Sequence, residues 1–433
     1  MHFNPLNLNQ ANVILDRYWK MFYSQKRDYE EEGMIMRNFI FISPHFPTNY
    51  ENFCVQLHEN GVNVFGIGDT PYENLTDSLK AALTEYYKVD SMEDYDQMVR
   101  AMGYFTHKYG KIDWLESNNE YWLTQDARLR TDFNITTGMK SEQVANVRRK
   151  SAMKAFYKKA GVPTARYHMV SSLEEGLAFA EEVGYPVFVK PDGGMGAEES
   201  YKLSNPDEMR YFYETKSDVD YIMEEFITGD IWSYDGISDS HGDIIFETTV
   251  SWPRSVADIV NNKDHLSYYT ANILPEDLRR AGRATVKAFD VRSRFFHLEF
   301  FRLLDDKEGL GKKGDIVALE VNMRPAGGWT PDMYNYANSV DVYSIWADMV
   351  VYDKTYVDLN QRKYFAVYAG RRNGKNYIHT PEEIRERYRD QIVMDEDIPE
   401  IISGAMGDHM WTARLDTEEQ KDEFIDFVQA TWQ

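Results

Sequence analysis

Two stretches of the chain alternate apolar and polar residues with a period of two, which is typical of strands buried on one face. Their apolar positions are Phe296, Leu298 and Phe300, then Val317, Leu319, Val321 and Met323. Their polar positions are His297 and Glu299, then Glu320, Asn322 and Arg324. The segment 305–315 between them is polar and glycine-rich, which favours a hairpin connection. We therefore predict an antiparallel hairpin whose polar face carries the chemistry.

The two glutamates are the most informative pair on that face. If Glu299 lies near Glu320, their side chains are cross-strand neighbours at about 5 Å, or about 7–8 Å on a diagonal. A solvated outer face is one interpretation of such a pair. The other is a Mg²⁺ site formed by Glu299, Glu320 and Asn322, because Mg²⁺ prefers a few carboxylate and amide oxygens together with water and phosphate. The turn Pro325–Gly328, which follows Arg324 directly, favours the second interpretation because glycines let backbone approach a ligand.

The N-terminal third predicts strands and helices in alternation. Strands are expected at 37–43, 62–67 and 112–116, with helices at 50–59 and 92–109 between them. This order is typical of a doubly wound α/β domain. The preceding residues 1–36 predict a helical extension, centred on 14–23.

The middle of the chain predicts a basic helix and a glycine loop. One helix is expected from Ser141 to Lys159, and its basic residues Arg148, Arg149, Lys150 and Lys154 would by themselves indicate a solvated face. A strand then ends in Lys190 and leads into Gly193, Gly194 and Gly196. Such a loop lets backbone N–H groups surround phosphate oxygens while the lysine supplies charge. The alternative interpretation is a plain hairpin tip. The loop leads to a strand at 199–203, and the Walker pattern is absent.

The rest of the chain predicts further alternating elements. Helices are expected at 206–215, 275–289 and 340–351, and a pair of strands at 231–236 and 243–252. The stretch 253–273 is polar and we expect it to be irregular. Residues from 364 onward predict strands and helices without a motif of their own.

Composition narrows the classes of function. The 433 residues include 48 Lys and Arg against 71 Asp and Glu, a net charge of −23, which argues against a nucleic-acid-binding surface. The single cysteine, Cys54, excludes an intrachain disulfide and fits a reducing compartment. There is no basic start followed by an apolar segment, nor any run long enough to span a bilayer. We therefore expect a cytoplasmic location and no membrane partner.

The ordered motifs resemble a known enzyme family. The row Glu-x-Asn-x-Arg at 320–324, preceded by His-x-Glu at 297–299, resembles the metal and catalytic strands of ATP-grasp ligases. More narrowly, it is similar to the carboxylate–amine ligase branch, which includes bacterial L-amino-acid (dipeptide) ligases. The resemblance implies an α/β (α+β) chain with an ATP-grasp fold at 141–355, including a lid hairpin at about 185–225. It also implies a Rossmann-like domain at 37–140 before it, after the extension 1–36, and a small C-terminal subdomain at 356–433.

The same resemblance assigns roles in binding ATP and Mg²⁺, or Mn²⁺. It places Lys150, Lys190 and the glycines 193, 194 and 196 at the phosphates. The backbone of Glu224, Glu225, Phe226 and Ile227 would meet the adenine edge. Relatives often carry a glutamate at the position of Ile231, so Asp230 is the substitute expected at the ribose. Glu299, Glu320 and Asn322 would hold the metal.

Catalytic and substrate roles are implied as well. Arg324 would steady the transferring phosphate and then the tetrahedral oxyanion. The residues expected to contact substrates are Arg254, His297, Gly327, Gly328 and Trp329. His297 is open to a second interpretation, in which it only orients a metal ligand.

The expected reaction joins a carboxylate to an amine. A small carboxylate, expected to be an amino acid, would be activated as an acyl phosphate and coupled to an amine, with release of ADP and phosphate. One alternative is a carboxylase or purine-pathway enzyme that uses carboxyphosphate or another amine. Another alternative is a nucleotide-binding regulator without catalytic activity. The presence of all three metal-type residues and of both lysines argues against a regulator. The partners expected are ATP and the two small substrates, and a homodimer is left open.

Overall fold

The computed structural model describes residues 37–194, 199–253 and 264–432. The predicted extension 1–36, with its helix, lies outside the described residues. No helix within the described ranges is long and apolar enough to cross a membrane.

The N-terminal part is a parallel four-stranded sheet with the order β3-β2-β1-β4. Its strands are β1 (Asn38–Ile42), β2 (Asn63–Gly68), β3 (Glu85–Lys88) and β4 (Trp114–Glu116). The helices that connect and follow the strands are α2 (Glu51–Glu59), α3 (Asp77–Ala82), α4 (Tyr95–Tyr109) and α5 (Leu123–Asp132). Every residue of β1 is buried, because Phe39 and Phe41 join one apolar core and Ile40 and Ile42 another. The predicted doubly wound sheet is confirmed.

The central sheet has nine strands, and every strand pair in it is antiparallel. Its main order is β14-β13-β9-β11-β12-β15-β17-β16, with β10 paired to β9. The strands are β9 (Gly229–Ser238), β10 (Ile244–Thr248), β11 (Val250–Trp252), β12 (Ser267–Thr270), β13 (Arg294–Leu303), β14 (Ile316–Asn322), β15 (Phe365–Arg371), β16 (Ile392–Asp397) and β17 (His409–Leu415).

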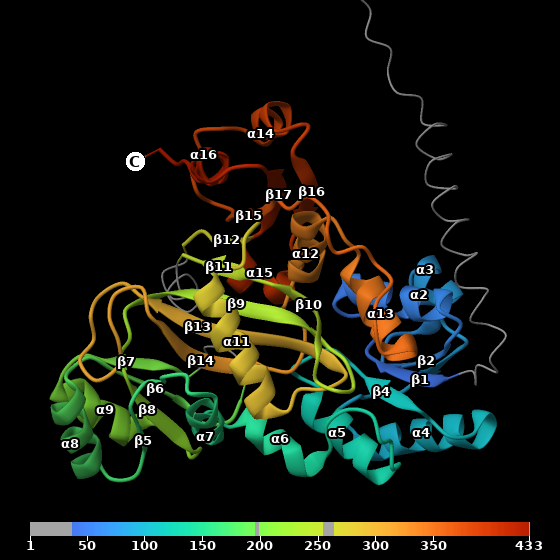
Figure 1. Cartoon of the computed structure of the whole chain (residues 1–433), viewed down its shortest axis with the longest axis horizontal. Coiled ribbons are helices and arrows are strands. Elements are labelled where there is room, and N and C mark those ends of the chain that lie inside the picture. The colour runs from blue at the N-terminus through green and yellow to red at the C-terminus, as the bar shows by residue number, and fades with distance from the viewer. Residues whose placement is uncertain (1–36, 195–198, 254–263, 433) are drawn as a thin grey trace, which may run out of the picture. The chain divides into compact units, whose positions relative to one another are not determined.

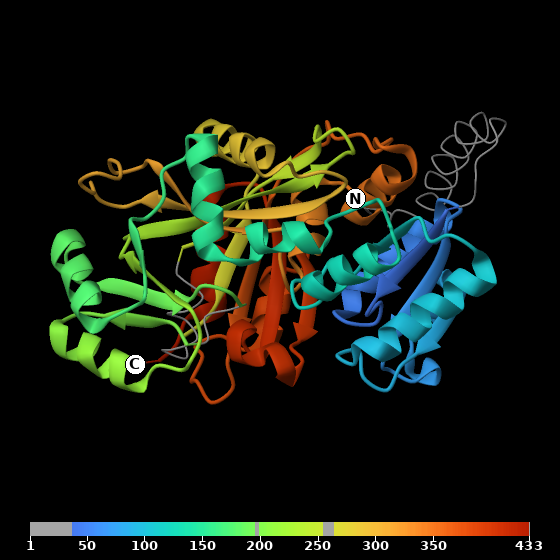
Figure 2. The same ribbon diagram turned by 90° about the horizontal axis from the view of Figure 1, so that it is seen from below.

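This sheet bears on two expectations. The C-terminal strands, drawn in red in Figure 1 and Figure 2, continue the sheet through the pairing of β12 with β15. The domain boundaries predicted at 140 and 355 stay predictions. The prediction that 253–273 is irregular was wrong for β12, because this short polar strand is held between β11 and β15.

A third, four-stranded sheet has the order β5-β8-β6-β7. It contains β5 (Tyr167–Met169), β6 (Val187–Pro191), β7 (Tyr201–Leu203) and β8 (Tyr221–Glu225), and it packs on α8 (Leu173–Val183) and α9 (Pro206–Thr215). β6 and β7 pair antiparallel, with Val187 opposite Leu203. The glycine loop therefore lies at the tip of a hairpin, as predicted.

The predicted helix from Ser141 to Lys159 is in fact two helices, α6 (Ser141–Arg148) and α7 (Lys150–Ala160). The chain leaves helical geometry at Arg149, where φ is −98° and ψ is 118°. Arg149 forms a β-bridge with Gly193, and the N–H of Lys150 donates a 2.8 Å hydrogen bond to the carbonyl oxygen of Asp192. The glycine loop therefore interrupts the helix and fixes where α7 begins.

The remaining helices cover the central sheet and its C-terminal extension. They are α11 (Glu276–Phe289), α12 (Thr330–Asn338), α13 (Val342–Tyr352), α14 (Pro381–Arg387), α15 (Glu400–Met406) and α16 (Glu418–Gln429). α7 and α11 pack against each other, and residues of both join the apolar cluster that contains Phe296, Leu298 and Val321. The apolar positions of the predicted hairpin thus lie in the core, and its polar row is left for the site.

Candidate active site

The predicted hairpin places the two glutamates directly opposite each other. β13 and β14 pair antiparallel with Glu299 opposite Glu320 and His297 opposite Asn322. On its other edge β13 pairs with β9, which sets Ser233 beside Glu299 and Asp235 beside His297. Directly opposite side chains on an antiparallel pair are the closest cross-strand neighbours. The predicted register of the two carboxylates is confirmed.

His297 holds Glu299 in place. Its Nε2 lies 3.0 Å from Oε1 of Glu299, and its Nδ1 lies 2.6 Å from Oδ1 of Asp235. Burial lowers the pKa of His297, but the charge of Asp235 and the hydrogen bonds to Asp235 and Glu299 outweigh it and raise the pKa to about 9. The imidazolium is therefore flanked by two carboxylates, and the geometry favours the orienting role for His297.

Three buried lysines pair with glutamates, two with Glu224 and one with Glu320. Lys190 Nζ lies 2.8 Å from Oε2 of Glu224, Lys154 Nζ contacts the other oxygen of the same carboxylate, and Lys150 Nζ lies 3.5 Å from Oε1 of Glu320. Burial raises the pKa of Glu224, but the charges of Lys190 and Lys154 reverse this and lower the pKa to about 2. The three lysine residues are each 7–8 % exposed. A buried cationic cluster of this kind suits a polyphosphate.

Lys154 was not among the predicted site residues. In the sequence it belongs to a basic helix face that could equally be solvated. Its spacing of four from Lys150 places the two on one side of a helix, and this was the available signal. The partner that decides its role, Glu224, comes from β8, which the sequence alone does not bring near.

Asp192 connects the glycine loop to the start of α7. Its carboxylate accepts hydrogen bonds from the backbone N–H of Ser151 at 2.7 Å, from the Ser151 hydroxyl at 2.9 Å and from Arg149 Nε at 2.8 Å. A carboxylate at a helix N-terminus accepts hydrogen bonds from otherwise unpaired N–H groups and interacts favourably with the helix dipole. This cap fixes Lys150 close to β6, the strand that carries Lys190.

Of the predicted loop glycines, two are described. Gly193 forms the bridge to Arg149, and Gly194 has φ of +126°, a conformation that side chains disfavour. Gly196 lies outside the described residues. Their contact with phosphate stays a prediction.

The predicted adenine segment is partly engaged by the protein itself. The Glu225 carboxylate binds Arg166, at 2.7 Å from its N–H and 2.8 Å from Nη2, and the Glu225 N–H donates to the Arg166 carbonyl oxygen. The Phe226 carbonyl oxygen accepts from Lys307 Nζ at 3.1 Å. These bonds hold the segment in an extended form, and the contact of Phe226 and Ile227 with adenine stays a prediction. Asp230 lies opposite Arg302, three positions along β9 from Ser233.

Arg324 is held by the loop that follows β4. Its Nε lies 3.4 Å from Oε2 of Glu120, and its Nη2 donates to Oδ1 of Asn322 at 3.4 Å. Glu120 also binds Arg148, which donates to the Glu120 carbonyl oxygen at 2.7 Å. Glu120 was missed in the sequence because nothing local links it to Arg324.

The loop after β1 reaches the same place. Asn49 Nδ2 donates to the Gly328 carbonyl oxygen at 3.1 Å and to Oδ2 of Asp332 at 2.8 Å. The Gly327 carbonyl oxygen accepts from the Thr330 hydroxyl, and Trp329 precedes α12, partly buried against the main core. Ligands of open α/β sheets bind where such loops meet at the carboxyl ends of the strands. Arg254, the remaining predicted substrate contact, lies outside the described residues.

The donor set fits a magnesium–nucleotide complex. Glu299, Glu320 and Asn322 offer hard oxygen ligands on adjacent strands of one sheet face. One oxygen of Glu299 is held by His297, and one oxygen of Glu320 is held by Lys150. The lysines at Glu224 and the capped glycine loop lie on the side where phosphates would be held.

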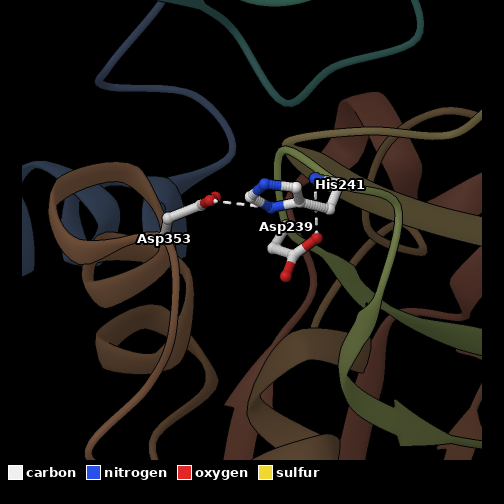
Figure 3. Close-up of side chains that lie close together, drawn as sticks. All are labelled: Asp239, His241 and Asp353. Atoms are coloured by element: carbon white, nitrogen blue, oxygen red, sulfur yellow. Dashed lines mark hydrogen bonds and ion pairs between the residues drawn. The ribbon is translucent and has the colours of Figure 1, made fainter.

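A second cluster of ligand-type atoms lies elsewhere. Figure 3 shows Asp239 and His241 in the turn between β9 and β10, facing Asp353 at the end of α13, with ligand atoms within 4.8 Å of one another. Both oxygens of Asp353 accept from Ser240, at 2.7 and 2.6 Å, and Asp239 accepts from two backbone N–H groups at 2.9 Å. These bonds fix the turn to the helix end, and we assign no metal here.

Comparison with known proteins agrees with this geometry. Residues 149–248 match the family model of the ATP binding domain of the carbamoyl-phosphate synthase L chain. An L-arginine-specific L-amino acid ligase of Bacillus subtilis is 25% identical over 319 residues, covering 70% of this chain and 73% of that protein.

Solved structures give the same fold. An L-amino acid ligase from Bacillus licheniformis superposes with a TM-score of 0.66 at 14% identity, covering 90% of this chain and 96% of that one. The biotin carboxylase domain of the Hydrogenobacter thermophilus 2-oxoglutarate carboxylase, in complex with MgADP, ADP and bicarbonate, gives a TM-score of 0.65 at 15% identity, with 91% and 90% covered. The fold, the ordered motifs and these relatives together make the chain similar to ATP-dependent ligases of the ATP-grasp superfamily.

Proposed function

We propose that the protein activates a small carboxylate, an amino acid in the first instance, as an acyl phosphate and couples it to an amine, releasing ADP and phosphate. The observation that carries the proposal is the directly opposed pair of Glu299 and Glu320, with buried Lys150 beside Glu320 and Arg324 at the end of the same strand. The similarity to an L-arginine-specific L-amino acid ligase supports the choice of an amino acid.

The first step follows from the weakness of a carboxylate as an electrophile. A carboxylate oxygen attacks the γ-phosphorus of ATP, and ADP leaves. Mg²⁺ held by Glu299, Glu320 and Asn322 would neutralise charge on the phosphates. Lys190 and Lys150 bind the phosphate oxygens. Both are buried lysines paired with carboxylates, so they supply positive charge where the phosphates bind. His297 keeps Glu299 aimed through its 3.0 Å hydrogen bond.

The second step forms the new bond. The amine attacks the acyl carbon, and phosphate departs as the amine loses a proton. Arg324 steadies first the transferring phosphate and then the oxyanion, because its guanidinium is oriented by Glu120 and Asn322 at the end of β14. Removing one such preorganised donor typically costs a factor of about 10²–10³ in rate.

A screen of amino acids with ATP and Mg²⁺ tests the proposal. Phosphate release is measured for single amino acids and pairs, and the activated acid is trapped with hydroxylamine as a hydroxamate. We expect amino-acid-dependent ADP and hydroxamate formation. Phosphate release that requires bicarbonate and yields no hydroxamate would instead indicate carboxyphosphate chemistry. This is the alternative function suggested by the similarity to a biotin carboxylase domain. ATP binding without any ADP release would indicate a regulator.

A further inference from the structure

Arg294 donates hydrogen bonds to the backbone immediately before Arg324. Its Nε and Nη2 lie 3.1 and 2.7 Å from the carbonyl oxygen of Met323. Arg294 begins β13 and alternates to the same strand face as Phe296, so its side chain leaves the strand on the side opposite Glu299. Arg294 therefore acts on Arg324 through the backbone, from behind the site.

The contacted carbonyl group lies just beyond the paired part of the hairpin. β14 ends at Asn322, and the pair of Asn322 with His297 is the outermost pair of the β13–β14 ladder at this end. Met323 is buried, and a buried carbonyl oxygen needs a hydrogen-bond donor. Because the peptide bond is planar, holding this oxygen also constrains the backbone N and Cα atoms of Arg324. Arg294 thus takes over from strand pairing at the point where the Arg324 side chain leaves the backbone.

A buried group of charges holds the Arg294 guanidinium. Its Nη2 lies 3.5 Å from Oε2 of Glu116, in β4 of the parallel sheet, and the same oxygen lies 2.8 Å from Nη2 of Arg130. Arg130 also donates from Nε to the carbonyl oxygen of Leu115 at 2.9 Å. Arg294, Glu116 and Arg130 are 3 %, 2 % and 0 % exposed. Removing one partner of ions buried this deeply is strongly unfavourable, so the group stays assembled in the folded protein.

The same segment of the chain also holds the side chain of Arg324. Glu120, four residues after Glu116, pairs with the Arg324 guanidinium. β4 and the loop after it therefore support both ends of this arginine, its backbone through Arg294 and its guanidinium through Glu120.

We propose that Arg294 is a positioning residue for Arg324, which links Glu116 of β4 to the backbone that carries the catalytic arginine. The inference rests on the proposed function, because it requires that Arg324 acts in the reaction.

The test compares Arg294→Lys with Arg371→Lys as a matched control. Lysine keeps the positive charge beside Glu116 but cannot donate from two nitrogens of a planar fork to one oxygen. Arg371 is also buried, and it donates to the carbonyl oxygens of Val428 and His379 in the C-terminal part of the chain. ADP formation is measured with ATP as the varied substrate and a saturating mixture of the common amino acids, and ADP affinity is measured by calorimetry.

We expect Arg294→Lys to lower kcat about tenfold, with the KM for ATP and the ADP affinity unchanged, because the lost hydrogen bond supports a group that acts during the reaction. Arg371→Lys should keep the wild-type kcat. Glu116→Gln weakens the hold on the Arg294 guanidinium and should also lower kcat at unchanged ADP affinity, which provides the test if Arg294→Lys does not fold.

A double variant connects the effect to Arg324. If Arg294 acts through Arg324, adding Arg294→Lys to Arg324→Ala should not lower the residual kcat further, because the group that Arg294 positions is already gone.

The outcomes separate the inference from the proposed function. The inference is overturned by a wild-type kcat in folded Arg294→Lys or Glu116→Gln, by an equal fall in Arg371→Lys, by a raised KM for ATP at unchanged kcat, or by a further fall in the double variant. Each of these results leaves the proposed function standing. A wild-type protein that forms no ADP with the amino-acid mixture would instead contradict the proposed function, and the inference with it.

Discussion

Glu120 and Arg324 form an ion pair between the two sheets that border the site, with Oε2 of Glu120 3.4 Å from Nε of Arg324. Glu120 follows β4 of the parallel sheet, and Arg324 follows β14 of the central sheet. Both side chains are largely buried, so the pair is weakly screened by solvent. The parallel sheet therefore helps to orient the arginine that the proposed mechanism uses.

Arg324→Ala should abolish product formation and leave nucleotide binding nearly intact. The guanidinium acts on charge that develops during the reaction, so we expect kcat to fall by a factor of about 10²–10³. ADP formation and ADP affinity are measured on the same preparation. Arg148→Ala is the matched control, because Arg148 also binds Glu120 and should have the smaller effect. Turnover of Arg324→Ala at the wild-type rate would remove Arg324 from the mechanism.

Glu120→Gln tests the ion pair itself. Glutamine keeps the shape of the side chain and loses its charge, so Arg324 would be aimed less well. We expect kcat to fall about tenfold, with the KM for ATP unchanged, because the affected interaction is made during the reaction. Steady-state kinetics with ATP as the varied substrate measure both constants. A raised KM with unchanged kcat would show that Glu120 serves nucleotide binding instead.

Glu224 should make the free protein sensitive to acid. An unfolded glutamate titrates near 4.5, whereas burial between Lys190 and Lys154 leaves the folded pKa at about 2. A lowered folded pKa gives stability that is present above pH 4.5 and is lost as the pH falls from about 4.5 to about 2. Glu224→Gln leaves two buried lysines without their partner, and we expect it to cost about 3–5 kcal/mol at pH 7. Urea unfolding between pH 3 and 7 should show a shallower pH dependence for the variant. An unchanged slope would contradict the assigned pKa.

Asp192→Ala should weaken both the fold and nucleotide binding. It removes the cap of α7 and the partner of Arg149, which together contribute about 2 kcal/mol to the free energy of unfolding. ADP affinity should fall as well, because the cap fixes Lys150. Ser151→Ala removes one hydroxyl donor to the same carboxylate and should cost less in both measurements. Equal ADP affinity in Asp192→Ala and the wild type would show that the cap does not position the phosphate site.

The hairpin of β13 and β14 could be predicted because its information is local. Period two and a short polar connection set the strands, and the burial of Phe296, Leu298 and Val321 leaves Glu299 and Glu320 only one face to share. The parallel sheet could likewise be predicted from alternating strands and helices.

Other features depend on contacts that a sequence does not display. Residues 141–159 favour a continuous helix, and the break at Arg149 arises from Gly193 and Asp192, which lie in another element. β12 is polar and short, and it becomes a strand only between β11 and β15. Lys154 and Glu120 were missed for the same reason, since their partners Glu224 and Arg324 lie far along the chain.

A crystal structure with Mg²⁺ and a non-hydrolysable ATP analogue tests the central claim most directly. We expect Glu299 and Glu320 to coordinate metal ions bridged to the phosphates, at about 2.0–2.1 Å, with Lys190 at a phosphate oxygen. Nucleotide bound away from β13 and β14, or the two glutamates turned to different compartments with no shared metal–phosphate centre, would contradict the account.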